Sequence, residues 1–345
     1  MTRVAFDATA RRSGVSQRCE ATVCLAADDC GVAYVRRNVA IPAFHRNKRP
    51  PGVCVVVSVL ALRGSALARH PHLWLFVAAL MLACGGAGYA DGAGNEVEKI
   101  APGVYMRPGK YAVVFEQDDI ANIGFVVGEK CVAVIDTGGS EAEGRALKAE
   151  IARITQVPIC FIIITHAHPD HMLGTLAFKG KGVSVIGHHK LARAQSLTGP
   201  TYLERAAQHE QRVLGPHYII PPDRTVEDEL ELDLGGRSLK VTAHPTAHTD
   251  HDLSVLDTHT GTLWLSDLLF IDYIPVVDGS INGWIAALEA LMQQPAERAV
   301  PGHGPVTPWP QAAGDLLRYL ETLRADIREL IADGGDISEA QMSAG

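Results

Sequence analysis

The chain has 345 residues, of which 47% are hydrophobic and 20% are charged, and its formal net charge at pH 7 is −8. This composition excludes a disordered, collagen-like or coiled-coil protein, and the length allows one large domain or two of ordinary size. Residues 1–90 carry 11 Lys and Arg against 4 Asp and Glu, whereas residues 91–345 carry 20 against 35. The two parts therefore have net charges of +7 and −15, which indicates that two kinds of sequence meet near residue 90.

Residues 61–90 have the parts of a secretory signal peptide: a basic flank, an apolar run at 73–84, and small residues up to Ala90. The apolar run is short for a membrane span, which needs about 20 residues, although an uncleaved anchor is the alternative interpretation. A signal peptide begins a protein. We therefore expect residues 1–60 to be a leader, read in frame from a start that was set too early, and not a domain.

Export would remove five of the seven cysteines and leave Cys131 and Cys160. Both occur in apolar, strand-like runs, which favours two buried free thiols over a disulfide.

From residue 100 onward the pattern shows strands first and then strands alternating with helices. The expected strands are 103–106, 112–115, 123–127, 131–135, 158–164, 184–187, 230–234, 239–243, 253–257, 262–265 and 298–300. The expected helices are 140–154 with Ser140 as its N-cap, 201–214, 281–292 and 310–332. This order favours a single α/β domain within residues 91–345.

The strand expected at 158–164 is followed directly by a histidine-rich motif, His166-x-His168-x-Asp170-His171. In an extended segment residues i and i+2 point the same way, so His166 and His168 can share one ion. Asp170 and His171, one turn further on, can face a second ion. Imidazole and carboxylate are the ligands of zinc, iron and manganese sites.

Three more residues that can bind metal stand at the ends of expected strands, namely His248, Asp267 and His303. Loops at strand ends gather at the rim of a sheet and form sites. A lone His or Asp at such a place is usually only solvated. Four segments with the same arrangement indicate one shared site.

This set, with Asp136-Thr137-Gly138 upstream, resembles the metallo-β-lactamase-fold hydrolase superfamily over residues 100–310. The resemblance implies an α/β fold, the αβ/βα sandwich of two facing sheets with helices outside, and a dinuclear metal site. It implies that two ions are held by seven ligands, with Asp267 bridging: His166, His168 and His248 for the first ion, and Asp170, His171 and His303 for the second. Asp136 and Thr165 are expected to support these ligands without touching the ions.

The expected cofactor is a pair of Zn²⁺ ions, with iron or manganese as alternatives. Two such ions sharing a water lower its pKa enough to supply hydroxide near neutral pH, and they polarise the substrate oxygen. Asp170 is the candidate catalytic residue because it can orient that nucleophile. The pocket is expected among loops 117–120, 187–214 and 269–283, with His251, Asp278 and Trp284 as candidate pocket residues.

The segment 274–280, followed by Gly283-Trp284, is similar to the quinoprotein relay system zinc metallohydrolases. That branch implies a periplasmic or secreted hydrolase, without stable membrane insertion after signal cleavage and accessory to a periplasmic quinoprotein dehydrogenase system. The expected reaction is attack on an ester, thioester, lactone or lactam carbonyl of a small molecule. A charge of −15 after residue 90 argues against a nucleic-acid partner. The alternatives are a metallo-β-lactamase, a persulfide dioxygenase-like iron enzyme and a non-catalytic metal-binding accessory module.

Overall fold

The computed structural model describes residues 97–110, 119–211 and 213–336. All of them belong to one compact unit of the chain, Cys84–Gly345. The expected leader and signal segment, and the strand expected at 112–115, lie outside the described residues. Within these described stretches, no helix has the length and apolar character needed to cross a membrane.

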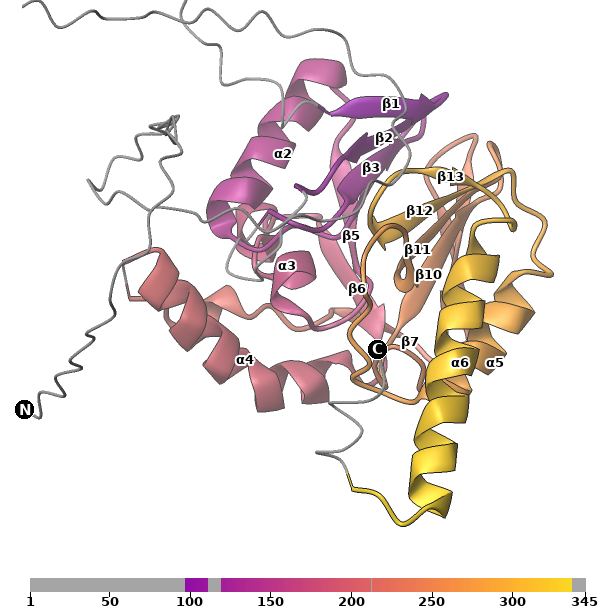
Figure 1. Cartoon of the computed structure of the whole chain (residues 1–345). Coiled ribbons are helices and arrows are strands. Elements are labelled where there is room, and N and C mark those ends of the chain that lie inside the picture. The colour runs from indigo at the N-terminus through magenta and orange to yellow at the C-terminus, as the bar shows by residue number, and fades with distance from the viewer. Residues whose placement is uncertain (1–96, 111–118, 212, 337–345) are drawn as a thin grey trace, which may run out of the picture. The chain divides into compact units, whose positions relative to one another are not determined.

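Two β-sheets form the centre of the domain (Figure 1). The first sheet has seven strands in chain order: β1 Glu98–Ala101, β2 Val104–Arg107, β3 Ile123–Val127, β4 Val132–Ile135, β5 Ile159–Ile164, β6 Ser184–His188 and β7 Arg224–Val226. The second sheet has six strands in the order β13-β12-β11-β10-β9-β8. Their bounds are β8 Glu229–Asp233, β9 Ser238–Ala243, β10 Leu253–Asp257, β11 Thr262–Phe270, β12 Arg298–His303 and β13 Thr307–Pro308.

Side chains of the first sheet alternate between two cores because successive residues of a strand point to opposite faces. In β4, Val132 and Val134 pack with Leu147 in an outer core. Ala133 and Ile135 of the same strand belong to an inner core that also contains residues of the second sheet. The sheets therefore face each other across the inner core.

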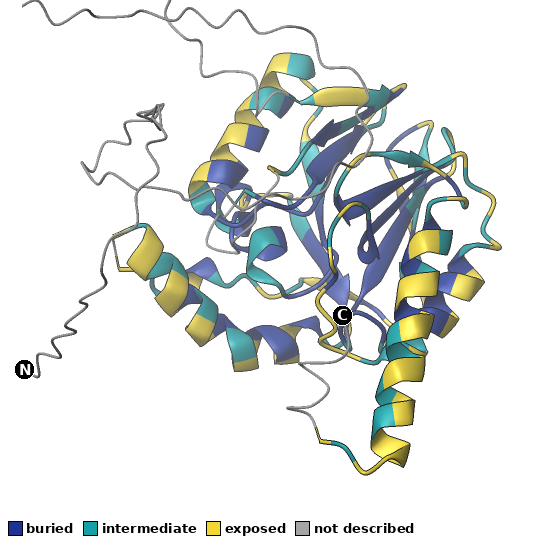
Figure 2. Cartoon of the chain, viewed as in Figure 1, coloured by how far each residue is buried: buried dark blue, intermediate teal, exposed yellow. Residues whose placement is uncertain are grey.

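Helices cover the outer face of each sheet, and Figure 2 shows their buried stripes and exposed outer sides. On the first sheet lie α2 Glu141–Ile154, α3 Pro169–Met172 and α4 Leu191–His209, with the short 3₁₀ turns η2 Thr175–Ala177 and η3 Pro216–Tyr218. On the second sheet lie α5 Ile281–Leu291 and α6 Ala313–Ala332. The predicted cap of α2 is confirmed, since the Ser140 hydroxyl accepts a hydrogen bond from the Glu143 amide at 3.2 Å. The predicted α/β sandwich of two sheets with outer helices is likewise confirmed.

The predicted start of α4 is wrong by ten residues. The helix begins at Leu191, not at residue 201, and continues through Pro200 although proline cannot donate the usual backbone hydrogen bond. Leu191, Ala194 and Leu203 are buried in the outer core, so tertiary packing holds the helix together on both sides of the proline. Strands β1, β7 and β13 were not predicted, because each is short and lies at or near a sheet edge.

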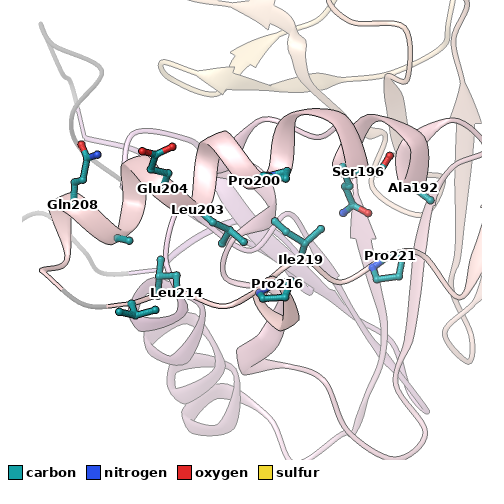
Figure 3. Close-up of a pocket in the computed structure, with 13 residues that line it drawn as sticks. Ala192, Ser196, Pro200, Leu203, Glu204, Gln208, Leu214, Pro216, Ile219 and Pro221 are labelled. Atoms are coloured by element: carbon teal, nitrogen blue, oxygen red, sulfur yellow. The ribbon is translucent and has the colours of Figure 1, made fainter.

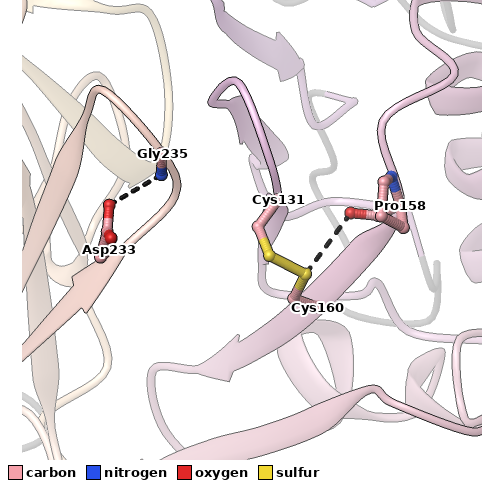
Figure 4. Close-up of a disulfide and its surroundings, with 5 residues drawn as sticks. All are labelled: Cys131, Pro158, Cys160, Asp233 and Gly235. Carbon is pink, nitrogen blue, oxygen red and sulfur yellow. Dashed lines mark hydrogen bonds between the residues drawn. A yellow bond between two sulfur atoms is a disulfide. The ribbon is translucent and has the colours of Figure 1, made fainter.

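The prediction of two free thiols is also wrong, because Cys131 and Cys160 form a disulfide with a Cα–Cα distance of 5.5 Å (Figure 4). Strands β4 and β5 are parallel neighbours, so the residues that begin them lie side by side. Their pairing steps from Val132↔Ile159 to Ala133↔Phe161, and this irregularity leaves Cys160 as the extra residue beside Cys131.

Candidate metal centre

The ends of several strands bring the seven predicted ligands together. His166 and His168 follow β5, Asp170 and His171 lie on α3, and the other three come from the second sheet and the loop after β9. They form two groups, and the candidate ligand atoms within each group lie within 4.8 Å of one another. The groups are His166, His168, His248 and Asp267, and Asp170, His171 and His303.

The first group converges on one point. His168 Nδ1 lies 3.0 Å from His166 Nε2 and 3.1 Å from His248 Nε2. The three rings meet at interplanar angles of 78°, 83° and 85°. A tetrahedral zinc ion with bonds of about 2.0–2.1 Å holds its ligand atoms about 3.3 Å apart, so this spacing fits a single ion.

The second group is wider and shares a carboxylate with the first. Asp170 Oδ2 lies 3.5 Å from both His171 Nε2 and His303 Nε2. Asp267 Oδ1 lies 3.2 Å from His171 Nε2 and 3.4 Å from His303 Nε2. The other oxygen, Asp267 Oδ2, lies 3.2 Å from His248 Nε2 in the first group. Each oxygen of Asp267 thus faces a different group, which is the position that a bridging ligand requires.

Two polar atoms of the centre are buried without a hydrogen-bond partner, His171 Nε2 and Asp267 Oδ1. Leaving such atoms unsatisfied is costly, and native structures rarely do so without a reason. A divalent cation bound by imidazole nitrogens and carboxylate oxygens would satisfy both atoms. The residues present therefore fit a pair of ions.

The outward nitrogen of each histidine meets an oxygen atom, which fixes the ring orientation and leaves the inward nitrogen free to bind a cation. The five contacts are His171 Nδ1 to Asp136 Oδ2 at 2.8 Å, His248 Nδ1 to Val276 O at 2.9 Å, His303 Nδ1 to Ile120 O at 3.0 Å, His166 Nδ1 to Thr165 Oγ1 at 3.1 Å and His168 Nε2 to Asp278 Oδ2 at 3.2 Å.

Asp136 forms a buried support beneath the centre. Its carboxylate accepts hydrogen bonds from the Thr165 amide and hydroxyl, both at 2.9 Å, and from the Ser266 hydroxyl at 3.1 Å. Asp136 and Ser266 have φ angles of 55° and 47°, a left-handed conformation that costs a non-glycine residue about 1–3 kcal/mol. The network joins the end of β4, the end of β5 and β11. Ser266 carried no signal of its own in the sequence beyond its place directly before Asp267.

The carboxylates and imidazoles of the centre shift one another's pKa values. Burial lowers the pKa of His171, but the carboxylates of Asp267, Asp170 and Asp136 outweigh this effect and hold that pKa well above its ordinary 6.5. Burial raises the pKa of Asp267, but His171 and His303 outweigh it, and the pKa lies well below its ordinary value. The carboxylates of Asp267, Asp170 and Asp136 therefore attract positive charge to this point.

Two residues that the sequence did not single out position His303. The Asn122 side chain donates hydrogen bonds to Pro301 O at 2.9 Å and to Gly304 O at 2.7 Å, and thereby ties β12 to the first sheet. Gly302 is required for close approach, since a Cβ there would lie 1.8 Å from Asp267 Oδ1. The only signal in the sequence was the Gly-His-Gly pattern around His303.

A cavity of about 680 Å³ opens onto both groups. Four of the candidate ligands line it, together with residues from α4 and from the loop after β11. A second cavity, of about 780 Å³, lies between α4 and the segment around η3 (Figure 3), and none of the seven ligands lines it. The cavity at the metal centre is therefore the candidate substrate pocket.

Each loop region expected to form the pocket contributes described residues, including Ile120, Tyr202 and Phe270. None of the three candidate pocket residues belongs to the described lining. Trp284 is 0% exposed and packs behind His248, and its indole donates a hydrogen bond to Leu268 O. The apolar face of α5 thus places it in the core of the second sheet.

His251 is 7% exposed and also lies outside the lining, with its Nδ1 atom 2.7 Å from Asp250 Oδ1. Asp278 is exposed and contacts His168 at the outer edge of the centre without lining the cavity.

The comparisons with known proteins agree with this geometry. The sequence profile of the Metallo-beta-lactamase superfamily matches residues 117–303, more than half of the chain. The linear primary-alkylsulfatase of Pseudomonas sp. (strain ATCC 19151) is 24% identical over 232 residues, which are 57% of this chain and 44% of the relative. The chain therefore spans less than half the length of that relative.

Solved structures show the same fold. A metallo-beta-lactamase from Pontibacter korlensis superposes with a TM-score of 0.55 at 21% identity, over 66% of this chain and 99% of that chain. One from Hirschia baltica superposes with a TM-score of 0.51 at 19% identity, over 66% and 95%. With the profile match and seven converging residues that could bind metal, the chain belongs to the metallo-beta-lactamase superfamily.

Proposed function

We propose that the protein is an exported hydrolase that uses two Zn²⁺ ions to cleave an ester, thioester, lactone or lactam of a small molecule. The observation that carries the proposal is the position of Asp267, whose two oxygens face two separate groups of histidines. Membership of a superfamily composed mostly of hydrolases supports the reaction type.

The roles of the residues follow from their places in the centre. His166, His168 and His248 would hold one ion, Asp170, His171 and His303 would hold the other, and Asp267 would contact both. The ions would supply Lewis-acid activation of the scissile carbonyl and of a water molecule. Asp170 lines the cavity, so its carboxylate can accept a hydrogen bond from the attacking nucleophile and orient it. Leu173, Phe270 and Val276 give the cavity apolar walls that hold the substrate and exclude water.

Metal analysis joined to a substrate panel tests this proposal. Protein beginning at residue 91 should contain close to two zinc ions and hydrolyse at least one member of a panel of esters, thioesters, lactones and β-lactams. His168→Ala should lower the metal content and abolish turnover. His259→Ala, at an exposed histidine outside both groups, is the matched control. One bound iron with oxygen consumption on a persulfide would instead indicate a dioxygenase, and bound metal without any turnover would indicate an accessory module.

Sulfate-ester hydrolysis is a second candidate activity, favoured by the similarity to the linear primary-alkylsulfatase. An alkyl sulfate therefore belongs in the same panel. Release of sulfate without cleavage of any carbonyl substrate would favour this second activity over the first.

We further propose that the protein works in the periplasm or outside the cell, beside a quinoprotein dehydrogenase system. The signal-like segment 61–90 and the resemblance of residues 274–280 to the quinoprotein relay branch support this. The intact mass of the exported protein tests the location. A chain beginning near Asp91 is expected, and a chain that keeps residues 3–49 would contradict both the signal peptide and the early start.

A further inference from the structure

One face of α4 forms a wall of the cavity at the metal centre. Tyr202, Arg205, Ala206 and His209 all line that cavity, and their spacing of i, i+3, i+4 and i+7 places them on the same side of the helix. The same cavity is lined by His168, Asp170, Asp267 and His303. Arg205 and four of the candidate metal ligands therefore border the same cavity.

Arg205 forms no ion pair and no side-chain hydrogen bond with the described residues, although its charge acts on the neighbouring Tyr202. Among the arginines in the described stretches, Arg205 and Arg224 alone have neither an ion pair nor a side-chain hydrogen bond. Each of the other described arginines forms an ion pair or a side-chain hydrogen bond; these are Arg107, Arg145, Arg153, Arg193, Arg237, Arg298, Arg318, Arg324 and Arg328. Arg224 is exposed on β7 and lines neither described cavity. Among the described arginines, Arg205 alone combines the lack of an ion pair or side-chain hydrogen bond with a place in the lining of a cavity.

Arg205 is also the one Lys or Arg in the described lining of this cavity. The segment that contributes Asp267, Phe270 and Val276 to the lining cannot supply another, because the sequence has no Lys or Arg between Lys240 and Arg298. The acidic residues of the lining do not neutralise it. Asp170 and Asp267 are directed to the histidines, and Glu210 has an interaction partner of its own.

We propose that Arg205 binds an anionic group of the substrate, such as a carboxylate, at a distance from the bond that is cleaved. A guanidinium presents paired N–H donors that match a carboxylate or sulfate. The apolar side chains of Leu173, Phe270 and Val276 line the same cavity. The substrate class is then an ester or thioester with an apolar body and a remote anionic end. This inference rests on the proposed hydrolase function and names the substrate class of that site.

Matched chromogenic esters test the inference. The probes are 4-nitrophenyl hemiesters of dicarboxylic acids from glutarate to suberate, compared with 4-nitrophenyl esters of monocarboxylic acids of the same lengths. Arg205→Ala should raise KM for the best hemiester about tenfold, equivalent to about 1.4 kcal/mol of binding free energy. Its kcat, and the KM for the neutral ester, should stay unchanged. Arg205→Lys should raise the KM for the hemiester by less than Arg205→Ala does, since lysine keeps the charge but not the paired donors. Arg205→Glu should raise this KM by more. Arg224→Ala is the control for removing an unpaired surface arginine.

Equal effects of Arg205→Ala on the hemiester and the neutral ester would overturn the inference. Calorimetric binding of suberate to zinc-loaded protein separates this result from failure of the proposed function. If no ester is cleaved but suberate binding weakens in Arg205→Ala and not in Arg224→Ala, this result supports the anion site and contradicts the proposed hydrolase activity. If suberate binds the wild type and Arg205→Ala equally, or binds neither, the anion site is refuted whatever the activity.

Discussion

Gly302→Ala is expected to disable the metal centre by displacing Asp267. An added Cβ at residue 302 would lie 1.8 Å from Asp267 Oδ1, whereas real Cβ atoms essentially never approach closer than 3.0 Å. The carboxylate oxygen must therefore move by at least 1.2 Å, the difference between these two distances. The Asp267 amide nitrogen, at 2.8 Å from the same Cβ, limits how far the backbone can yield.

A movement of this size exceeds what the centre tolerates. Metal–ligand distances hold to within about 0.2 Å, and a displacement of about 1 Å at a catalytic site can cost about 100-fold in rate. Because Asp267 faces both groups, its displacement weakens both ion sites together. We therefore expect Gly302→Ala to bind at most one ion and to lose at least about 100-fold in kcat/KM.

The assay combines metal analysis, turnover of the best panel substrate and urea unfolding. Gly314→Ala is the matched control, since it makes the same change in α6 where a Cβ meets nothing within 4 Å. That control should keep metal and activity, with stability unchanged or raised by up to about 1 kcal/mol. Circular dichroism checks that Gly302→Ala keeps its fold.

A double-mutant cycle identifies the clash. If the carboxylate is the obstacle, Gly302→Ala should cost less stability in an Asp267→Ala background than in the wild type. Additive stability losses would show that the carboxylate is not what the new methyl group meets. Two bound ions with normal turnover in Gly302→Ala would refute the reasoning altogether.

Three further outcomes are expected. Asp136→Asn should weaken metal binding about 10- to 100-fold by disturbing the support of His171, as measured by competition with a chromogenic chelator; unchanged affinity would contradict this role. Replacing Cys131 and Cys160 by serine should cost about 3–4 kcal/mol of unfolding free energy for a loop of 29 residues, while kcat/KM is kept because the disulfide lies at the strand ends opposite the centre. Burial lowers the pKa of His244 from 6.5 to about 4, so the unfolded chain takes up a proton that the folded chain does not, and stability falls as pH drops from 6.5 towards 4. His244→Asn should therefore gain unfolding free energy relative to the wild type as the pH falls over that range. A difference in unfolding free energy that does not depend on pH would contradict the lowered pKa of His244.

The sequence was sufficient to predict the two-sheet fold and the set of residues at the centre. The strand at 131–135 and the Ser140 cap of α2 are local features, and both predictions were confirmed. The ligands could be found because each follows or ends an apolar strand, and parallel strands deliver their ends to one edge of a sheet. The structure brings all seven together, while their roles in binding and catalysis stay predictions.

What the sequence could not predict depended on contacts between distant segments. The disulfide required the irregular register between β4 and β5, which the apolar run of β5 does not reveal. The start of α4 required knowledge that Leu191 and Ala194 would be buried in the outer core, since Pro200 locally favours a break. Trp284 lies in the core because α5 packs on β11. It was predicted to line the pocket because it directly follows the loop at 269–283.

The centre depends on the packing of the two sheets as much as on its own ligands. His166, His168, Asp170 and His171 come from the first sheet and its connections, whereas Asp267 and His303 lie on strands of the second. Asn122 donates across this junction to both sides of the His303 loop. Ser266 donates from the second sheet to Asp136 beneath the first. A change at either junction would alter the distance between the two groups without removing a single ligand. Buried polar residues at such junctions are therefore where substitutions would change the metal pair while leaving its ligand set intact.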